Sequence, residues 1–241
     1  MFRHKGKTRT FKHNLRLAAL LSFIAGLVNV VGVLQLKVLT TNVTGHFAFF
    51  AEELMQKNYF LASNFLLFIF SFLSGAFASS LITEYFAKRG KKAAHKYSMS
   101  IEITILLSIG SYGNYFLIMY HIYLIVACLL LFAMGIQNSL VTQISNSTVR
   151  TTHLTGLFTD LGIELSQLFF YKKEEQQQKL KKNIELRIAI IGCFFIGCVI
   201  GGFLYSILSF AVLIIASALL FLALSYDVLL FNYYKIRRRN S

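Results

Sequence analysis

Two related segments carry acidic and hydroxyl side chains in a chain that is otherwise mostly apolar. Residues 40–56 read TTNVTGHFAFFAEELMQ, and residues 151–167 read TTHLTGLFTDLGIELSQ. Aligned without gaps, the two segments share eight of their seventeen positions. In each segment, a Thr-Gly pair is followed by a glutamate further along the same predicted helix. Such groups inside a membrane could bind a proton or a small polar solute.

The threonine-rich run before each glycine predicts a helix start. A threonine followed by glycine suits this position, where backbone N–H groups have no partner within the helix. A helix N-terminus at membrane depth is an electropositive pole that favours an anionic group. We therefore predict substrate contacts from Thr41, Thr44 and Gly45 in the first segment and from Thr152, Thr155 and Gly156 in the second. The alternative is that these threonines only cap helices that lie on the two membrane surfaces.

The acidic residues of the segments form the second part of the predicted site. Glu53 and Glu164 occupy equivalent positions in the alignment. An acidic side chain at membrane depth costs roughly 2.5–3.5 kcal/mol, so it normally faces a cavity or a partner. We predict that this pair and Asp160 line a central polar site and carry a proton. The alternative is that they are hydrated at the level of the lipid headgroups.

Several single polar residues lie within or beside apolar runs. Asn29 in GLVN and Asn138 in GIQN stand before the two Thr-Gly segments. Such residues more often form hydrogen bonds between helices, worth about 0.6 kcal/mol each, and substrate contact by both is the hypothesis held beside that one. His46 is interpreted as structural. Glu102 is predicted to be hydrated at the cytoplasmic rim of its span.

The composition predicts an integral membrane protein. Of 241 residues, 56% are hydrophobic and 14% are charged, whereas a soluble domain has about 25% charged residues. The mean hydropathy is +0.62. The stretches 17–36 and 207–226 contain no charged residue, and about 20 such residues span the hydrocarbon layer.

Segment length and charge predict six membrane spans, at about 17–36, 60–86, 98–119, 122–144, 187–206 and 209–231. If neither Thr-Gly segment crosses, 22 of the 24 Lys and Arg residues face the cytoplasm, and only Lys37 and Lys57 lie outside. This agrees with the positive-inside rule. The predicted location is the cell (inner) membrane, with both termini cytoplasmic.

The fold class expected is all-α, in one membrane domain (1–232) built from two three-span repeats, 15–120 and 121–232. Because three is an odd number, the second repeat would be inverted relative to the first, as in many secondary transporters. Residues 172–186 are predicted to be a cytoplasmic loop, with a helical extension as the alternative. Residues 233–241 are predicted to be a basic cytoplasmic tail.

Other function classes receive little support from the sequence. The net charge of +14 lies in clusters beside apolar spans, so no nucleic-acid partner is expected. No phosphate-binding loop or catalytic motif is legible, so neither an enzyme nor a cofactor is expected. Cys128, Cys193 and Cys198 lack metal-ligand spacing. The partners expected are the lipid bilayer and a small-molecule or ion substrate. A homodimer through the small residues Gly197 and Gly201 is left open.

The motifs AMGIQNSLVTQ and VRTTHLTGLFTDLG resemble those of the YoaK-like small multi-pass membrane proteins, a domain-of-unknown-function family. The stretch GLVNVVG and the later LTTNVTGH resemble the first half of that family. The resemblance covers roughly residues 15–232 and implies a membrane location and architecture without assigning an activity. The function predicted is a small secondary transporter or permease with a central site between inverted repeats. The alternative is a non-transporting membrane scaffold or assembly factor.

Overall fold

The computed structural model describes residues 10–91, 94–118 and 122–239, and every regular element in them is helical. The first half contains α1 (Phe11–Val31), which continues as a π-helical turn (Gly32–Leu36), α2 (Val43–Met55), α3 (Tyr59–Lys88) and α4 (His95–Ile118). The second half contains α5 (Tyr123–Ser145), α6 (Leu154–Phe170), α7 (Glu174–Leu208), a short 3-10 turn (Ser209–Ala211) and α8 (Val212–Arg239). The prediction of an all-α fold is confirmed.

Four helical segments of the described chain are long and apolar enough to cross a membrane: Phe11–Leu36, Tyr59–Lys88, Tyr123–Ser145 and Glu174–Tyr226. The fourth segment contains α7 and the first part of α8. The two helices of the Thr-Gly segments are shorter. A helix of 13 residues such as α2 spans only about 20 Å, less than the roughly 30 Å of hydrocarbon.

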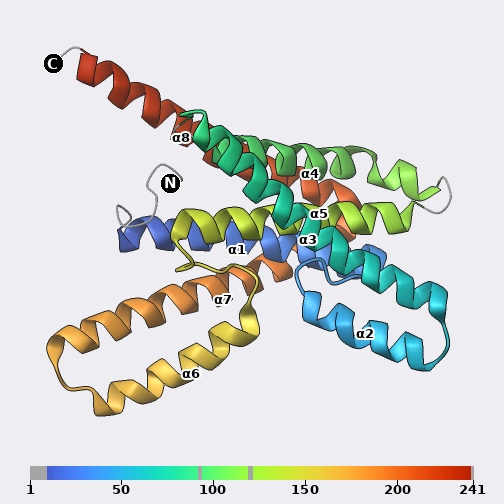
Figure 1. Ribbon diagram of the computed structural model, residues 1–241, viewed down its shortest axis with the longest axis horizontal. Helices are drawn as coiled ribbons and strands as arrows, with labels where there is room; N and C mark the ends of the chain where they lie inside the picture. The colour runs from blue at the N-terminus through green and yellow to red at the C-terminus, as the bar shows by residue number, and fades with distance from the viewer. Residues whose placement is uncertain (1–9, 92–93, 119–121, 240–241) are drawn as a thin grey trace.

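The long helices run along a common direction, while α2 and α6 start in the middle of the molecule (Figure 1). In this view α1, α4 and α7 run from left to right, and α3, α5 and α8 run back. Helix α2 leaves the middle toward the right and turns into α3, whereas α6 leaves the middle toward the left and turns into α7. The N-termini of the two short helices therefore point inward, and their C-termini point to opposite ends.

Helices α1 and α7 pack side by side in a parallel orientation through glycines. A Cβ atom on Gly197 would overlap the backbone carbonyl of Phe23, and one on Gly201 would contact Leu27. From Gly197 to Gly201, the contact on α1 moves from Phe23 to Leu27, in the same direction along the chain. The two helices are therefore parallel. Gly26 in turn lies against the backbone of Phe194. Small residues at such spacing allow helix backbones to approach closely in lipid.

Helices α3 and α5 repeat this arrangement. Gly75 lies against the carbonyl of Phe132, and Gly135 lies against that of Phe72. One turn earlier on both helices, Ser71 contacts Cys128, so this pair is also parallel. In both pairs, a first helix of one half packs against the second long helix of the other half.

The predicted small-residue face for a homodimer is already occupied inside the chain. Gly197 and Gly201 both face α1, so they do not form a surface that a second copy could use. The sequence correctly indicated close helix packing at these glycines, but their partner is a helix of the same chain.

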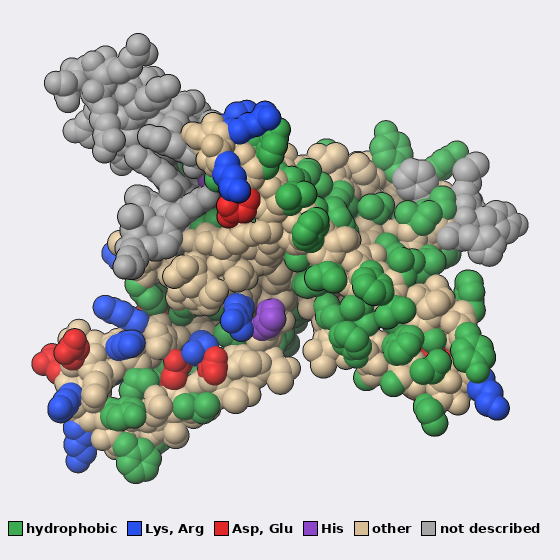
Figure 2. Space-filling view, viewed as in Figure 1, with side chains coloured by type: hydrophobic (Ala, Val, Ile, Leu, Met, Phe, Trp, Pro, Cys, Tyr) green, Lys and Arg blue, Asp and Glu red, His purple; other side chains and the backbone are tan. Residues whose placement is uncertain are grey.

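The core is apolar and joins helices from both halves. Its buried members include Leu21 on α1, Leu106 on α4, Met134 on α5 and Ile190 on α7. Helices α4 and α8 meet where Gly110 lies against Ile214. Outside this core, large apolar side chains are exposed over α2 and α3, and Figure 2 shows them covering the right side of the molecule. A lipid environment accounts for such a surface.

The prediction of a loop at residues 172–186 is wrong in its secondary structure. Helix α7 begins at Glu174 and continues without interruption to Leu208, which agrees with the alternative of a helical extension. Glu174 and Glu175 stand in the first helical turn, where negative charge is favoured by the helix dipole. Only residues 171–173 connect α6 to α7.

Candidate functional site

A hydrogen bond ties the start of α2 to α1. The Thr41 hydroxyl donates to Oδ1 of Asn29 over 3.0 Å. Thr41 is buried, and Asn29 is half-buried. The bond holds the chain after the π-helical turn against the helix from which it came. We refer to Asn29 and Thr41 as the first Asn–Thr node.

The second half contains the equivalent bond. The Thr152 hydroxyl donates to Oδ1 of Asn138 over 2.8 Å, and the Asn138 amide donates to the Met134 carbonyl over 3.0 Å. Thr152 precedes α6 by the same two positions by which Thr41 precedes α2. Asn138 and Thr152 form the second Asn–Thr node. The structure therefore pairs four of the predicted site residues, two in each half.

Each node adjoins a buried threonine whose hydroxyl has no hydrogen-bond partner. Thr40 and Thr151 are both 0% exposed, and the Oγ1 atom of each is unpaired. The methyl group of Thr40 lies so close to Gly32 that a larger residue there would clash. A buried unpaired hydroxyl typically costs about 1–3 kcal/mol. Two such groups at equivalent places indicate polar positions that a ligand or water could satisfy.

The two short helices begin differently. Asn42 caps α2, because its Oδ1 accepts a hydrogen bond from the Gly45 N–H over 3.0 Å. At α6 the residue in this position is His153, which makes no capping hydrogen bond through its side chain. Gly156 lies in the first turn of α6 with open space where a side chain would be. The amide groups at the start of α6 are thus less covered than those of α2.

The two other threonines of the predicted site lie at the surface. Thr44 and Thr155 are exposed, and the carbonyl of Thr155 accepts a hydrogen bond from the Thr159 hydroxyl. Neither threonine joins an Asn–Thr node. Their exposed hydroxyls contribute nothing to the buried polar positions described above.

An ion-pair cluster lies between α6 and α7. Arg187 donates from Nε to Oε2 of Glu164 over 2.6 Å and from Nη2 to Oε1 over 3.0 Å. Its Nη1 lies 2.9 Å from Oδ2 of Asp160. The Glu164 side chain is 9% exposed and that of Asp160 is 51% exposed. The polar face of α6 is therefore turned inward against α7, and Phe158, Phe169 and other apolar residues face outward.

A pocket of about 400 Å³ opens beside this cluster. Arg150, His153, Gly156, Asp160, Asn183 and Arg187 are among its lining residues. Burial and the nearby charge of Arg150 lower the pKa of His153, so its imidazole is neutral at pH 7. The pocket combines guanidinium and carboxylate groups with the uncapped start of α6. This mixture suits a small polar solute that carries a negative group.

Glu53 does not join Glu164 and Asp160. Its Oε2 accepts a hydrogen bond from the Asn58 side chain over 2.9 Å in the turn between α2 and α3. In Figure 1 this turn and the α6–α7 pair lie at opposite sides of the molecule. The three acidic residues predicted to line one central site are thus placed at two separate positions.

The two Asn–Thr nodes are also separate. The Gln137 side chain donates to the Leu21 carbonyl over 2.9 Å, which fixes α5 beside α1 at that level. Asn29 lies eight residues further along α1, a rise of about 12 Å. The site is therefore better described as two related polar positions than as one cluster.

His46 is structural, as its isolated position in the sequence suggested. It is 1% exposed, and its Nε2 lies 2.8 Å from the Leu39 carbonyl. Its ring packs against Phe65 and Phe68 of α3, with centroids 5.9 and 5.4 Å away. These contacts hold α2 against α3.

Sequence reasoning missed two groups. Arg187 was assigned to the start of a span, although a lone arginine entering an apolar run is a signal for a nearby carboxylate. Glu102 was expected at a hydrated rim, but it is 1% exposed. Within the described residues, no group of three or more His, Cys, Asp and Glu residues is placed to hold a metal ion.

Comparison with known proteins places most of the chain in one protein family. Residues 17–226 match the family model described as "Protein of unknown function (DUF1275)". The UPF0700 transmembrane protein YoaK of Bacillus subtilis (strain 168) is 26% identical over 186 residues, which are 76% of this chain and 80% of that protein. No solved structure gives a significant match.

Proposed function

The chain belongs to the DUF1275 family, and from this premise we propose that it is a small secondary transporter or permease built from two inverted three-span repeats. The observation that carries the proposal is the pair of Asn–Thr nodes. Each node stands at the start of a helix shorter than the long helices, and the two helices run outward in opposite directions from the middle (Figure 1). Discontinuous helices that meet in this way are typical of secondary transporters.

The proposed topology has six spans, with both termini on the cytoplasmic side of the inner membrane. Support comes from the directions of the helices. With the Thr-Gly segments not crossing, spans one and five point the same way, as do spans two and four. The glycine contacts give this parallel orientation for α1 with α7 and for α3 with α5. If only one Thr-Gly segment crossed, α1 and α7 would be antiparallel.

The proposed substrate is a small solute with a negatively charged group. The buried hydroxyls of Thr40 and Thr151 lack partners, and helix N-termini supply donors for an anion. In this proposal the solute exchanges between the polar position of the first half and that of the second. The pocket at Arg150 and Arg187 is the entrance on the cytoplasmic side.

Uptake into liposomes tests the proposal. Purified protein is reconstituted, and a panel of radiolabelled small organic anions and cations is compared with protein-free liposomes. We expect uptake of at least one anion, reduced at least tenfold in a variant with both Thr40→Val and Thr151→Val. Thr159→Val is the matched control, because its exposed hydroxyl bonds only within α6. Metabolite flux in a deletion strain and an overproducing strain supplies an independent readout.

A membrane scaffold or assembly factor is the second candidate, and one observation favours it. The core shared by α1, α4, α5, α7 and α8 consists of buried apolar side chains, and Asp160, Asn183 and Arg187 on α6 and α7 line the polar pocket. A scaffold needs rigid packing and no path for solute. Uptake equal to that of protein-free liposomes for every solute, with unchanged fluxes in both strains, would favour the scaffold over the transporter.

A further inference from the structure

A carboxyl group outside the two Thr-Gly segments is buried on α4. Glu102 on α4 is 1% exposed, and its Oε1 atom has no hydrogen-bond partner. Ser98 and Leu106, one turn before and one turn after it on the same face of the helix, are both 0% exposed. Glu102 is therefore enclosed by protein on a buried helical face.

Hydroxyl groups on α3 and α4 lie near Glu102, one turn before it on α4 and near the end of α3. The Ser98 hydroxyl donates to the Ser79 carbonyl over 3.2 Å and lies 3.4 Å from the Thr83 hydroxyl. Ser79 is itself buried, and its hydroxyl has no partner. Thr83 stands near the end of α3, which finishes at Lys88. Ser98, Ser79 and Thr83 thus form a buried cluster of hydroxyl groups one helical turn from Glu102 and within the last three turns of α3.

No described cation pairs with Glu102. Helix α4 packs against α3, α5 and α8. On α3, the charged residues are Glu84 and Lys88, both exposed. On α4, His95 is buried and Lys96 is half-buried, both in its first turn.

The described side chains of the other packed helices add no charge. Helix α5 has no charged residue, and α8 has none up to Tyr226, the last residue of α8 whose side chain is described. The described tyrosines on these helices are exposed, and Cys128 on α5 is half-buried. The ion pairs of Arg187 are made with Asp160 and Glu164 and do not include Glu102.

We propose that Glu102 is a proton-binding site and that it carries the coupling ion of the transporter. The coupling role rests on the proposed function, but proton binding does not. An ionised carboxylate without a cation or donor is strongly disfavoured in an apolar interior, so this conformation holds the neutral carboxyl. In the step proposed, the carboxyl O–H bond breaks and its electron pair stays on oxygen. The proton passes along the hydroxyls of Ser98 and Thr83 to water at the end of α3, and the reverse path reloads the site.

Infrared spectroscopy tests proton binding directly. The purified protein in lipid is titrated with base, and the carbonyl stretch of a protonated carboxyl is followed. We expect this band at neutral pH in the wild type and its loss in Glu102→Gln, which keeps the size and neutrality of the buried group. Glu84→Gln, an exposed carboxylate on α3, should leave the band unchanged. A wild-type spectrum without the band, or a band that survives in Glu102→Gln, would overturn the proposal.

Proton movement tests the coupling. Liposomes with a trapped pH-sensitive dye and an inside-negative potassium diffusion potential receive each solute of the radiolabelled panel. In the wild type, solute entry should acidify the interior. Glu102→Gln should show at least tenfold less acidification than the wild type, but the solute should still enter down its concentration gradient. Unchanged acidification in Glu102→Gln would refute the coupling role. The absence of solute entry in the wild type would refute the transporter instead, and the infrared band would still decide whether Glu102 binds a proton.

Discussion

The Thr152 hydroxyl donates to the Asn138 side chain over 2.8 Å, and this bond is the counterpart of the one from Thr41 to Asn29 over 3.0 Å. Each bond joins the start of a short helix to the long helix before it. The same two residue types therefore fix the direction in which both short helices leave the middle of the molecule.

Removing either partner of the second node should reduce stability, and the effects of the two removals should not be additive. We expect Asn138→Ala and Thr152→Val each to lower the free energy of unfolding. A double-mutant cycle should give a coupling of about 0.6–1.7 kcal/mol, the range of hydrogen bonds between membrane helices. Titration with SDS in mixed micelles measures these values. Thr159→Val is the control, and additive effects of the two changes would contradict the bond.

Alanine should be tolerated at one glycine of α7 and not at another. Gly197 lies against the carbonyl of Phe23, whereas nothing lies within 4 Å of a Cβ atom at Gly192. Gly197→Ala should cost about 1–3 kcal/mol, because α1 and α7 must separate. Gly192→Ala should be neutral or stabilise by up to about 1 kcal/mol through helix propensity. Thermal unfolding in detergent compares them, and equal effects would show that α1 and α7 are not in close contact at Gly197.

Replacing Arg187 should destabilise the protein more than replacing either carboxylate that it binds. Arg187→Gln leaves the buried Glu164 without its cation, which costs about 3 kcal/mol or more for a buried pair. Asp160→Asn should have the smallest effect, because the Asp160 side chain is 51% exposed. The unfolding free energy of each variant tests this order. The double variant of Arg187→Gln with Glu164→Gln should regain part of the loss, and a strictly additive loss would rule out the pairing.

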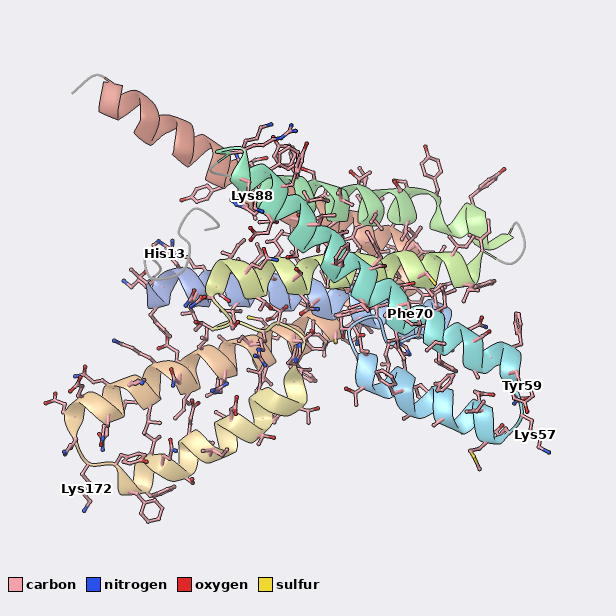
Figure 3. The ribbon with its side chains drawn as sticks, in the orientation of Figure 1. His13, Lys57, Tyr59, Phe70, Lys88 and Lys172 are labelled. Carbon is pink, nitrogen blue, oxygen red and sulfur yellow. The ribbon has the colours of Figure 1, made fainter. Side chains whose placement is uncertain are left out.

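The two hairpin turns should be labelled from opposite sides of the membrane. Lys57 and Lys172 lie at opposite ends of the molecule (Figure 3). In a background without Cys128, Cys193 and Cys198, an impermeant maleimide on intact cells should label Lys57→Cys and not Lys172→Cys. Permeabilised cells should show both. Labelling of both variants in intact cells would place the two turns on the same side of the membrane and would contradict the inverted arrangement.

Much of the helix layout could be predicted from the sequence, because apolar length and charge placement act locally. The predicted spans at 60–86 and 122–144 differ from α3 and α5 by a few residues at most. The segment 172–186 was harder, since polar composition suits a solvated helix as well as a solvated loop. Helix propensity and the acidic first turn of α7 favour the helix.

The candidate site was less predictable, because its contacts join residues that are distant in sequence. The polar face of α6 is visible in the sequence, but Arg187 as its partner depends on the angle between α6 and α7. The burial of Glu102 depends on the rotation of α4 against α3. The spacing of Gly197 and Gly201 predicts a close neighbour but does not identify it as α1.

The cross-packing of the two halves also affects how the protein is made. Gly26 and Cys198 are joined by a hydrogen bond across 172 residues of sequence. During synthesis, α1 therefore enters the bilayer long before α7 has left the ribosome, and its glycine face has only lipid against it meanwhile. Neither half expressed as a fragment contains both members of a glycine pair, so the halves have to mature together.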